Sequence, residues 1–267
     1  MSNENLLHTF IVLAYKESKY IEDCIKSVLD QKYPSKVVIA TTTPNKYIEN
    51  IANKYRLDMI IGKHTNIGGD FDFAKNCSDT ELSTIAHQDD IYDKTYSEKI
   101  VKFYKKFPEA SIIFTNYYEI RNGKNIYTNK NLKIKSFLLF PLKIKSISGV
   151  KFIKRLSIRF GDGISCPAVS FVNNNIPNNL FESEYKANVD WYAWEKLSKM
   201  TGKFIYINQK LMGHRITTDS ETTKIINSGQ RINEDYDIFR KFWPKPIAVM
   251  LKNMYKSAEK SNNVNNE

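Results

Sequence analysis

The sequence predicts an α/β fold in which helices flank a mostly parallel sheet of the nucleotide-binding type. Over the first hundred residues, short apolar runs with the length of buried strands alternate with helical patterns, as in sheets built from βαβ units. The fourth such run, residues 82–86, ends abruptly in His87-Gln88-Asp89-Asp90. Open α/β sheets bind ligands at the carboxyl ends of their strands, so this acidic turn marks the expected site.

The first part of the chain is expected to contain four buried strands, at residues 8–14, 37–40, 59–61 and 82–86. Apolar residues at helical spacing predict helices over 21–29, from Pro44 to Tyr55, and over 73–77. Pro44 suits the first turn of its helix, where a backbone N–H is not needed. A fourth helix is expected to end near Pro108, a strand to cover 111–120, and Asn122-Gly123 to form a hairpin turn.

The second part of the chain gives fewer signals between Ile126 and Phe160, where one helix is predicted over 150–156. A strand over 164–172, interrupted by Cys166-Pro167, precedes a helix over 189–200 and a short strand over 204–207. His214 and Arg215 are then expected on a loop. Two helices, over 232–243 and 247–260, close the folded part of the chain.

The composition is that of a folded and strongly basic protein. The 267 residues are 42% hydrophobic and carry a formal net charge of +11, which indicates an anionic partner. No acidic residue occurs between Glu119 and Asp162, and the eleven basic residues of that interval equal the whole net charge. They are Arg121, Lys124, Lys130, Lys133, Lys135, Lys143, Lys145, Lys151, Lys154, Arg155 and Arg159.

Several classes of protein are disfavoured by what the sequence lacks. Residues 1–5 lack the basic start and apolar core of a signal peptide, and no apolar run is long enough to span a bilayer, so a cytoplasmic protein is expected. Cys24, Cys77 and Cys166 are too widely spaced for a zinc site or a disulfide framework and are expected to be reduced. Neither a dinucleotide-binding Gly-x-Gly-x-x-Gly after the first strand nor a P-loop motif is found.

The acidic turn has two interpretations. The adjacent carboxylates of Asp89 and Asp90 are hard oxygen ligands, which suit Mn²⁺ or Mg²⁺ together with a phosphate-bearing substrate. Alternatively, the turn is solvated and an aspartate caps the next helix, a role that Asp93 could equally fill. The residues of the turn alone leave both interpretations open.

Several segments, in order along residues 8–220, resemble the family two inverting glycosyltransferases of GT-A fold. They are Ile11 to Ser18 with Ser27 to Gln31, Asn66-Ile67-Gly68-Gly69 with Ala74-Lys75-Asn76, Ala86 to Tyr92, Asn188 to Trp191, and His214-Arg215 with Ser220. The resemblance implies a GT-A-like domain over residues 1–225, with a nucleotide-sugar half over about 1–121 and an acceptor half over about 122–225. A C-terminal helical extension over 226–260 and a disordered tail over 261–267 are expected to follow.

The resemblance also implies roles for individual residues. Asp89 matches the metal-binding Asp of the family's acidic motif, with Asp90 supporting it and His214 as a distal ligand of Mn²⁺ or Mg²⁺. A purely structural His214 is the alternative. The residues expected on the nucleotide side follow the first, second and fourth strands or carry positive charge; they are Ala14, Tyr15, Glu17, Thr41, Lys75, Gln88 and Arg215.

Three positions depart from the family pattern. His87 stands where the family often has the first Asp of its acidic motif, and Thr41 stands where an Asp usually contacts the base. Lys75 replaces an Arg, which keeps the positive charge but not the bidentate fork. These departures leave the nucleotide open, with UDP favoured and GDP or dTDP as alternatives.

Asp190 matches the family's catalytic base, which would deprotonate the acceptor hydroxyl. Glu182 and Glu184 are rival bases, and Asp190 could instead cap the helix over 189–200. Trp191 could stack on a sugar face, exclude water or belong to the core, as expected for Trp194. Cys166 is not expected to act as a nucleophile, because no neighbouring residue in the sequence would clearly lower its pKa.

The sequence therefore predicts an inverting, metal-dependent glycosyltransferase that moves a sugar from a nucleoside diphosphate sugar to a glycan or lipid-linked acceptor. Synthesis of capsule, O-antigen or another surface polysaccharide is the expected setting. Basic residues mixed with aromatics, in the acid-free interval and at 239–246, suit an anionic membrane surface at the inner face of the plasma membrane, or else a solvated basic face. The alternative is a non-catalytic nucleic-acid-binding α/β protein that uses the same basic residues.

Overall fold

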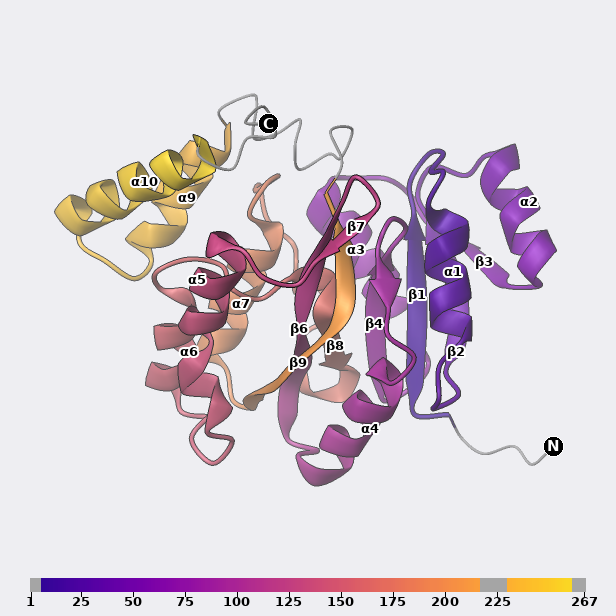
Figure 1. The fold of residues 1–267 in the computed structure, drawn as a ribbon, viewed down its shortest axis with the longest axis horizontal. Coiled ribbons are helices and arrows are strands. Elements are labelled where there is room, and N and C mark those ends of the chain that lie inside the picture. The colour runs from indigo at the N-terminus through magenta and orange to yellow at the C-terminus, as the bar shows by residue number, and fades with distance from the viewer. Residues whose placement is uncertain (1–5, 217–229, 261–267) are drawn as a thin grey trace.

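The computed structural model of the protein describes residues 6–216 and 230–260 (Figure 1). The predicted disordered tail over 261–267 and the motif residue Ser220 lie outside this part. Within the described part, no helix is both long enough and apolar enough to cross a membrane.

The first half of the sheet is parallel, as the alternation of apolar runs predicts. Its elements are β1 (His8–Ala14), α1 (Ile21–Leu29), β2 (Lys36–Thr41), α2 (Lys46–Tyr55), β3 (Asp58–Ile61), α3 (Ile67–Asn76) and β4 (Leu82–His87). β1 lies between β2 and β4 and pairs with both in parallel, and β3 pairs in parallel with β2. The βαβ prediction for this region is therefore confirmed, and the carboxyl ends of these strands lie at one edge (Figure 1).

Two helices of this half start elsewhere than predicted, because each is set by an asparagine cap. The Asn45 side chain accepts a hydrogen bond from the Ile48 N–H at 3.0 Å, so α2 begins at Lys46 and Pro44 lies outside the helix. The Asn66 side chain caps α3 in the same way, through the Gly69 N–H at 2.8 Å. The helix therefore begins six residues before the predicted start at Phe73, in a stretch whose glycines give no hydrophobic signal.

The second half of the sheet is mixed, so the whole sheet is less parallel than predicted. Its strands are β5 (Ile91–Tyr92), β6 (Ala110–Arg121), β7 (Lys124–Ile126), β8 (Val169–Val172) and β9 (Lys203–Arg215). The strand order is β3-β2-β1-β4-β8-β6-β9-β5, with β7 paired to β6. β8 runs antiparallel to both β4 and β6, and β9 runs parallel to β6 but antiparallel to β5.

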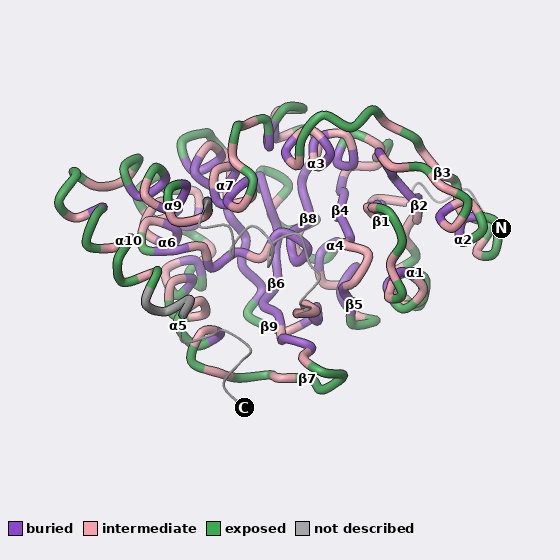
Figure 2. The backbone as a smooth tube through the Cα atoms, turned by 90° about the horizontal axis from the view of Figure 1, so that it is seen from above, coloured by how far each residue is buried: buried purple, intermediate pink, exposed green. Residues whose placement is uncertain are grey.

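Helices cover both faces of the sheet (Figure 2), and a layer of buried apolar side chains lies on each face. The helices of the second half are α4 (Tyr96–Lys106), α5 (Lys130–Leu138), α6 (Lys151–Ile158), α7 (Val189–Lys199), α9 (Gln230–Arg240) and α10 (Lys245–Lys260). Short 3₁₀ turns are η1 (Phe140–Lys143), η2 (Cys166–Ala168) and η3 (Asn173–Asn175). Phe10 and Val12 of β1 pack with residues of α1, α2 and α4, whereas Ile11 faces the layer that contains α3, α6 and α7.

β9 is much longer than predicted, and this changes the setting of two candidate site residues. Thr115 of β6 pairs with Ile207, but Asn116 pairs with Lys210, so β9 bulges at residues 208–209 and then continues to Arg215. The exposed polar residues of the bulge interrupt the apolar pattern, which explains why a loop was expected. His214 and Arg215 therefore lie on a strand and not on a loop.

The described part of the C-terminal helices packs onto α7. Trp191 of α7 contacts Phe239 of α9 edge-on at 5.1 Å between ring centroids, and Tyr255 of α10 stacks on the same indole at 5.9 Å. Both tryptophans of α7 are fully buried. The core assignment of Trp194 is confirmed, and sugar stacking by Trp191 is wrong because none of its side chain is exposed.

Candidate functional site

The acidic turn after β4 is joined to the end of β9, although the two segments are far apart in the chain. β5 follows the turn directly and pairs with β9, with Ile91 opposite Gly213, so His214 lies beside Asp90. The Asp90 carboxylate is fully buried and accepts hydrogen bonds from His214 Nδ1 at 3.0 Å and from the Arg215 N–H at 2.9 Å. Asp90 therefore fixes the orientation of the His214 ring.

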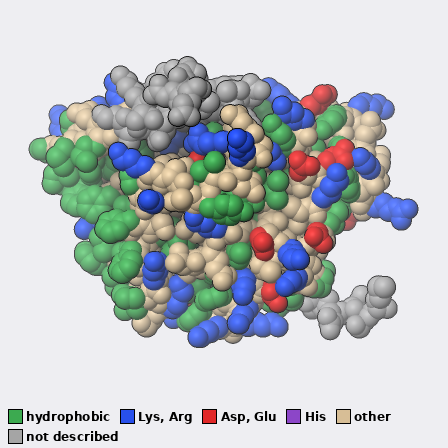
Figure 3. Space-filling model, in the orientation of Figure 1, with side chains coloured by type: hydrophobic (Ala, Val, Ile, Leu, Met, Phe, Trp, Pro, Cys, Tyr) green, Lys and Arg blue, Asp and Glu red, His purple; other side chains and the backbone are tan. Residues whose placement is uncertain are grey.

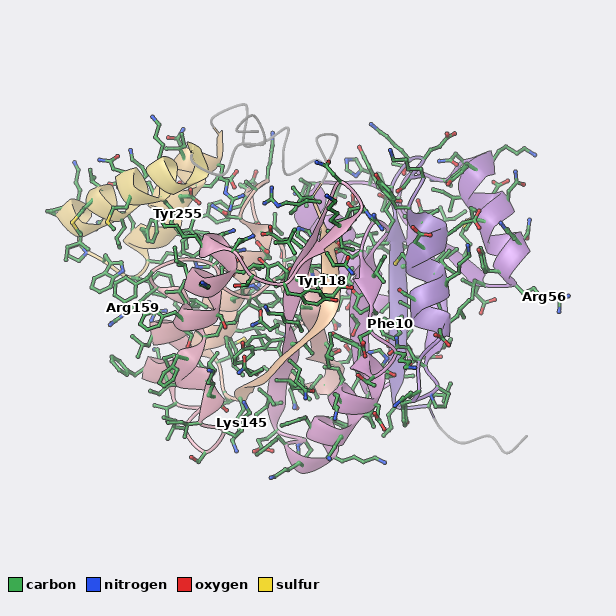
Figure 4. All side chains as sticks on the ribbon, viewed as in Figure 1. Phe10, Arg56, Tyr118, Lys145, Arg159 and Tyr255 are labelled. Atoms are coloured by element: carbon green, nitrogen blue, oxygen red, sulfur yellow. The ribbon has the colours of Figure 1, made fainter. Side chains whose placement is uncertain are left out.

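A glycine on β9 leaves room for this arrangement. A Cβ atom at Gly213 would lie 2.6 Å from the ring of Tyr118, the residue paired with it on β6 (Figure 4). The Tyr118 ring can therefore lie flat over β9 next to the site. A larger residue at position 213 would displace this ring or the strand that carries His214.

The two aspartates of the turn lie in different electrostatic environments. Burial and then the Asp90 charge raise the pKa of Asp89 to about 6. Burial lowers the pKa of His214, but the carboxylates of Asp90 and Asp89 more than offset that effect, so the net shift is upward. Asp90 thus orients the His214 ring, and Asp89 is left as the carboxyl that a further cation would stabilise.

The residues of the turn fit a divalent cation that is completed by its substrate. No group of three His, Cys, Asp or Glu side chains within residues 6–216 and 230–260 is arranged to hold a metal ion by itself. Mg²⁺ sites typically use one or two carboxylates and take their other ligands from water and substrate phosphates. The Asp89 carboxylate, with its raised pKa, and the fixed imidazole of His214 suit such an open site.

The loop after β1 is fastened to the acidic turn by one predicted residue. The Gln88 side chain accepts a hydrogen bond from the Tyr15 N–H at 3.1 Å and donates one to the Tyr15 carbonyl at 2.9 Å. Ala14 is buried below this pair, and Glu17 is exposed beyond it. Gln88 therefore sets the position of Tyr15 relative to Asp89.

Thr41 ends β2 at the same edge of the sheet and is fully buried. Its hydroxyl accepts a hydrogen bond from the Thr43 N–H at 3.1 Å. The Thr43 hydroxyl in turn accepts one from the Lys16 N–H at 2.8 Å. The loops after β1 and β2 are thereby joined.

The two predicted phosphate contacts lie in different places. Arg215 lies at the site: its Nε donates to the Asp89 carbonyl at 2.9 Å, and its guanidinium covers the Tyr20 ring at 4.1 Å. Lys75 lies in the last turn of α3, and its ammonium donates to Asn76 at 2.6 Å. Because α3 runs back from the carboxyl edge of the sheet, the structure does not bring Lys75 together with the acidic turn.

A second acidic group faces the site from the other half of the molecule. Asp190 lies in the first turn of α7, but the helix cap is Asn188, so Asp190 is not the cap that the sequence allowed. The Asp190 side chain forms a hydrogen bond with the Asp162 side chain. Burial and then the Asp190 charge raise the pKa of Asp162 well above its ordinary value, which favours the protonated form of Asp162 beside Asp190.

Sequence reasoning missed Asp162. Its one signal was its position as the first acidic residue after the long acid-free interval. The rival bases Glu182 and Glu184 are both exposed, and Glu182 accepts a hydrogen bond from Asn179 at 2.8 Å. The half-buried, hydrogen-bonded carboxyls of Asp162 and Asp190 are therefore better candidates for proton transfer than either glutamate.

The two acidic groups are linked by polar side chains. Lys135 lies over the Tyr117 ring at 5.5 Å and is attracted by Asp162, and both groups raise its pKa despite its burial. Tyr117 in turn meets the His214 ring edge-on at 6.0 Å. Lys135 also came from the acid-free interval, where its charge alone did not single it out.

Two further residues lie between the acidic groups. The Nε2 atom of His87 is buried and has no hydrogen-bond partner among the described residues. Burial lowers the pKa of His87, while Asp90 and Asp190 act to raise it. The Cys166 thiol is buried, and burial together with Asp190 and Asp162 raises its pKa, which agrees with the expectation that it is not a nucleophile.

Comparisons with known proteins agree with this fold. A family model described as glycosyl transferase family 2 matches residues 9–161, more than half of the chain. The fold is similar to that of S. aureus TarS 1–349 in complex with UDP-GlcNAc, with a TM-score of 0.61 and 14% identity, covering 98% of this chain and 74% of that chain. It is also similar to the mannosyltransferase PcManGT from Pyrobaculum calidifontis in complex with GDP-Man and Mn²⁺, with a TM-score of 0.59 and 12% identity, covering 96% and 76%. No curated protein matches the chain in sequence.

Proposed function

The chain belongs to glycosyl transferase family 2 and is a glycosyltransferase of GT-A-like fold, and we propose that it inverts the anomeric centre of a nucleoside diphosphate sugar. The acceptor is the hydroxyl of a glycan or a lipid-linked glycan in surface-polysaccharide synthesis. One observation carries the proposal. A turn suited to a metal and a diphosphate, at Asp89 and Asp90, is linked by polar side chains to the hydrogen-bonded carboxyls of Asp162 and Asp190.

The carboxyl pair supplies the base. The acceptor oxygen forms a bond to the anomeric carbon while the bond from that carbon to the diphosphate breaks. Asp190 takes the acceptor proton, and a positioned base of this kind contributes about 10²–10⁴-fold to the rate. Asp162 holds the Asp190 carboxyl through their shared hydrogen bond. Attack and departure on opposite faces of the sugar give inversion.

The acidic turn holds the donor. A bound Mn²⁺ or Mg²⁺ would act as a Lewis acid that neutralises the diphosphate leaving group. Asp89 and His214 would hold it, and Asp90 would keep His214 in the required orientation through its Nδ1. Arg215 contributes a fixed positive charge beside Asp89. Lys75 has no role in this proposal, because the structure does not bring it to the turn.

The nucleotide binds across the loops after β1, β2 and β4, where Ala14, Tyr15, Glu17, Thr41 and Gln88 lie. UDP is the favoured nucleotide, and GDP and dTDP are the alternatives. One structural neighbour was solved with UDP-GlcNAc and another with GDP-Man and Mn²⁺, which supports a nucleotide sugar without deciding between the bases.

The test separates binding from catalysis. Thermal shifts with UDP, GDP and dTDP, each with and without Mn²⁺, identify the nucleotide, since a ligand of the native state raises its melting temperature. With the best nucleotide sugar, Asp190→Asn should reduce turnover by about 10²–10⁴-fold and leave the nucleotide-induced shift unchanged. Glu182→Gln is the control, because this exposed rival base should keep full activity. Normal turnover by Asp190→Asn, or a large loss in Glu182→Gln, would contradict the assignment.

A further inference from the structure

One end of the molecule exposes an unusual set of large apolar side chains. Phe137 of α5 is 76% exposed, Phe152 of α6 is 60% exposed, and Met254 of α10 is 62% exposed. The other exposed apolar residues of these elements and their connections are Ile134, Phe140, Ile144, Val150, Phe160, Val249 and Met250. Figure 3 shows such side chains gathered at the end of the molecule where α5, α6 and α10 lie, opposite to α2. We call this surface the α5–α6–α10 face.

The structure divides the basic residues of the acid-free interval into two groups. Lys154 is fully buried and donates to the carbonyls of Met200 and Gly202, which lie between α7 and β9. Arg155 is paired with the buried carboxylate of Glu195 at 2.8 Å. Others of the interval remain exposed: Lys124, Lys130, Lys133, Lys143 and Lys151. Some of the positive charges of this interval are therefore buried or paired within the fold, and the others are exposed to solvent.

Within residues 120–161 and 238–258, the segments that form the face carry no acidic residue beside these cations. The interval between Glu119 and Asp162 contains α5, η1 and α6. The sequence is also free of acidic residues between Asp237 and Glu259, which includes most of α10 and the basic residues Lys245, Lys252 and Lys256. Exposed apolar side chains, with lysines nearby and no acidic residues among them, are complementary to a surface that has hydrocarbon beneath a layer of negative charge.

We propose that the α5–α6–α10 face is a docking surface for an anionic lipid bilayer. The phenylalanines enter the interface between headgroups and acyl chains, and the lysines contact anionic headgroups. A second copy of the chain fits less well, since a two-fold contact would oppose like charges. Nucleic acid also fits less well, since it gives no burial to Ile134, Ile144, Val150 or Met250.

The face adjoins the acceptor side of the proposed active site. α5 presents Phe137 outward and carries Lys135, which turns inward to Tyr117 and Asp162. Tyr255 of α10 accepts a hydrogen bond from the Asp162 N–H at 3.2 Å, at the same end of the molecule as Arg159 (Figure 4). Docking would hold the Asp162–Asp190 pair close to the bilayer. Membrane binding itself does not depend on the proposed reaction.

The experiment is co-sedimentation of the full chain with phosphatidylcholine vesicles, with and without phosphatidylglycerol, at low and high salt. The wild-type protein should bind the anionic vesicles, and binding should weaken with salt. Lys133→Gln with Lys143→Gln should weaken it by about fivefold per lysine. Phe137→Ser with Phe152→Ser should weaken binding further at high salt. The controls are Lys46→Gln with Lys102→Gln and Leu29→Ser, which change exposed residues away from the face and should bind normally.

Three results would overturn the proposal. The first is equal vesicle binding by the face variants and the controls. The second is binding of single- or double-stranded nucleic acid, lost in the lysine variants, without binding of vesicles. The third is a wild-type dimer that does not bind vesicles and that Phe137→Ser converts to a monomer. Melting curves identify any variant that fails to fold, and the lysine variants, changed only at exposed positions, then decide.

Discussion

Asp90→Asn tests whether a buried carboxylate sets up the metal site without being its principal ligand. In the native protein the Asp90 carboxylate accepts from His214 Nδ1 at 3.0 Å and from the Arg215 N–H at 2.9 Å. An asparagine oxygen can still accept both bonds, so the fold should survive. The substitution removes the negative charge of the group that accepts the hydrogen bond from His214 Nδ1.

The size of the effect follows from that difference. A hydrogen bond to a charged group contributes about 1.5–3 kcal/mol and a neutral one about 0.5–1.5 kcal/mol, so Asp90→Asn removes about 1–2 kcal/mol of ring orientation. Loss of such an orienting partner typically costs about 10–100-fold in metal affinity. We therefore expect Mn²⁺ affinity, measured by calorimetry in the presence of the nucleotide, to fall by at least about tenfold. Asp89→Asn should abolish it.

The control lies three residues along the chain. The exposed Asp93 carboxylate accepts hydrogen bonds from the neighbouring Thr95, at 2.9 Å from its N–H and 2.5 Å from its hydroxyl, next to the start of α4. Asp93→Asn makes the same chemical change and should leave Mn²⁺ affinity unchanged. If Asp90→Asn bound Mn²⁺ as tightly as Asp93→Asn, the orienting role of Asp90 would be refuted.

Three other predictions concern buried groups. Between the unfolded pKa near 3.9 and its raised folded pKa, Asp162 binds more protons in the native state, so its contribution to stability falls as pH rises. Asp162→Asn should therefore melt higher than wild type at about pH 8 but not at about pH 4, and the same shift at both would contradict this. Glu195→Ala leaves Arg155 without its partner and should cost about 2–4 kcal/mol in urea unfolding, less if solvent screens the pair. Burial raises the pKa of the Cys24 and Cys166 thiols, so both should resist a thiol reagent until the protein unfolds, and fast reaction of either would argue against their burial.

Local sequence patterns predicted the first half of the sheet well because each βαβ unit is determined by nearby residues. The apolar runs of β1, β2 and β4 and the stripe of α1 are continuous in sequence, so their periodicity is visible. α3 was predicted short because Gly68 has no side chain. A Cβ there would lie 2.3 Å from the Phe181 carbonyl oxygen, so glycine is required by a close approach that only the fold reveals.

The candidate site was harder to predict because its parts come from distant segments. The resemblance supplied Asp89, Asp190 and His214, but not the partners of these residues. Asp162 and Lys135 are joined to the site by contacts between distant segments and by the packing of α5. The hydrophobic periodicity of the sequence carries no information about such contacts. The bulge in β9 also hid the strand that carries His214.

The position of β9 has a consequence for the folding of the protein. β9 is the last strand to be synthesised among those of residues 6–216 and 230–260, yet it lies between β6 and β5 and completes the turn at Asp90. A nascent chain that ends before Lys203 would leave β6, a strand of 12 residues, with an open edge. Contacts of such long sequence separation form slowly and expose strands that can associate with other chains. The proposed donor site therefore assembles only after β9 has emerged, and the interval before that is when this protein most needs protection from aggregation.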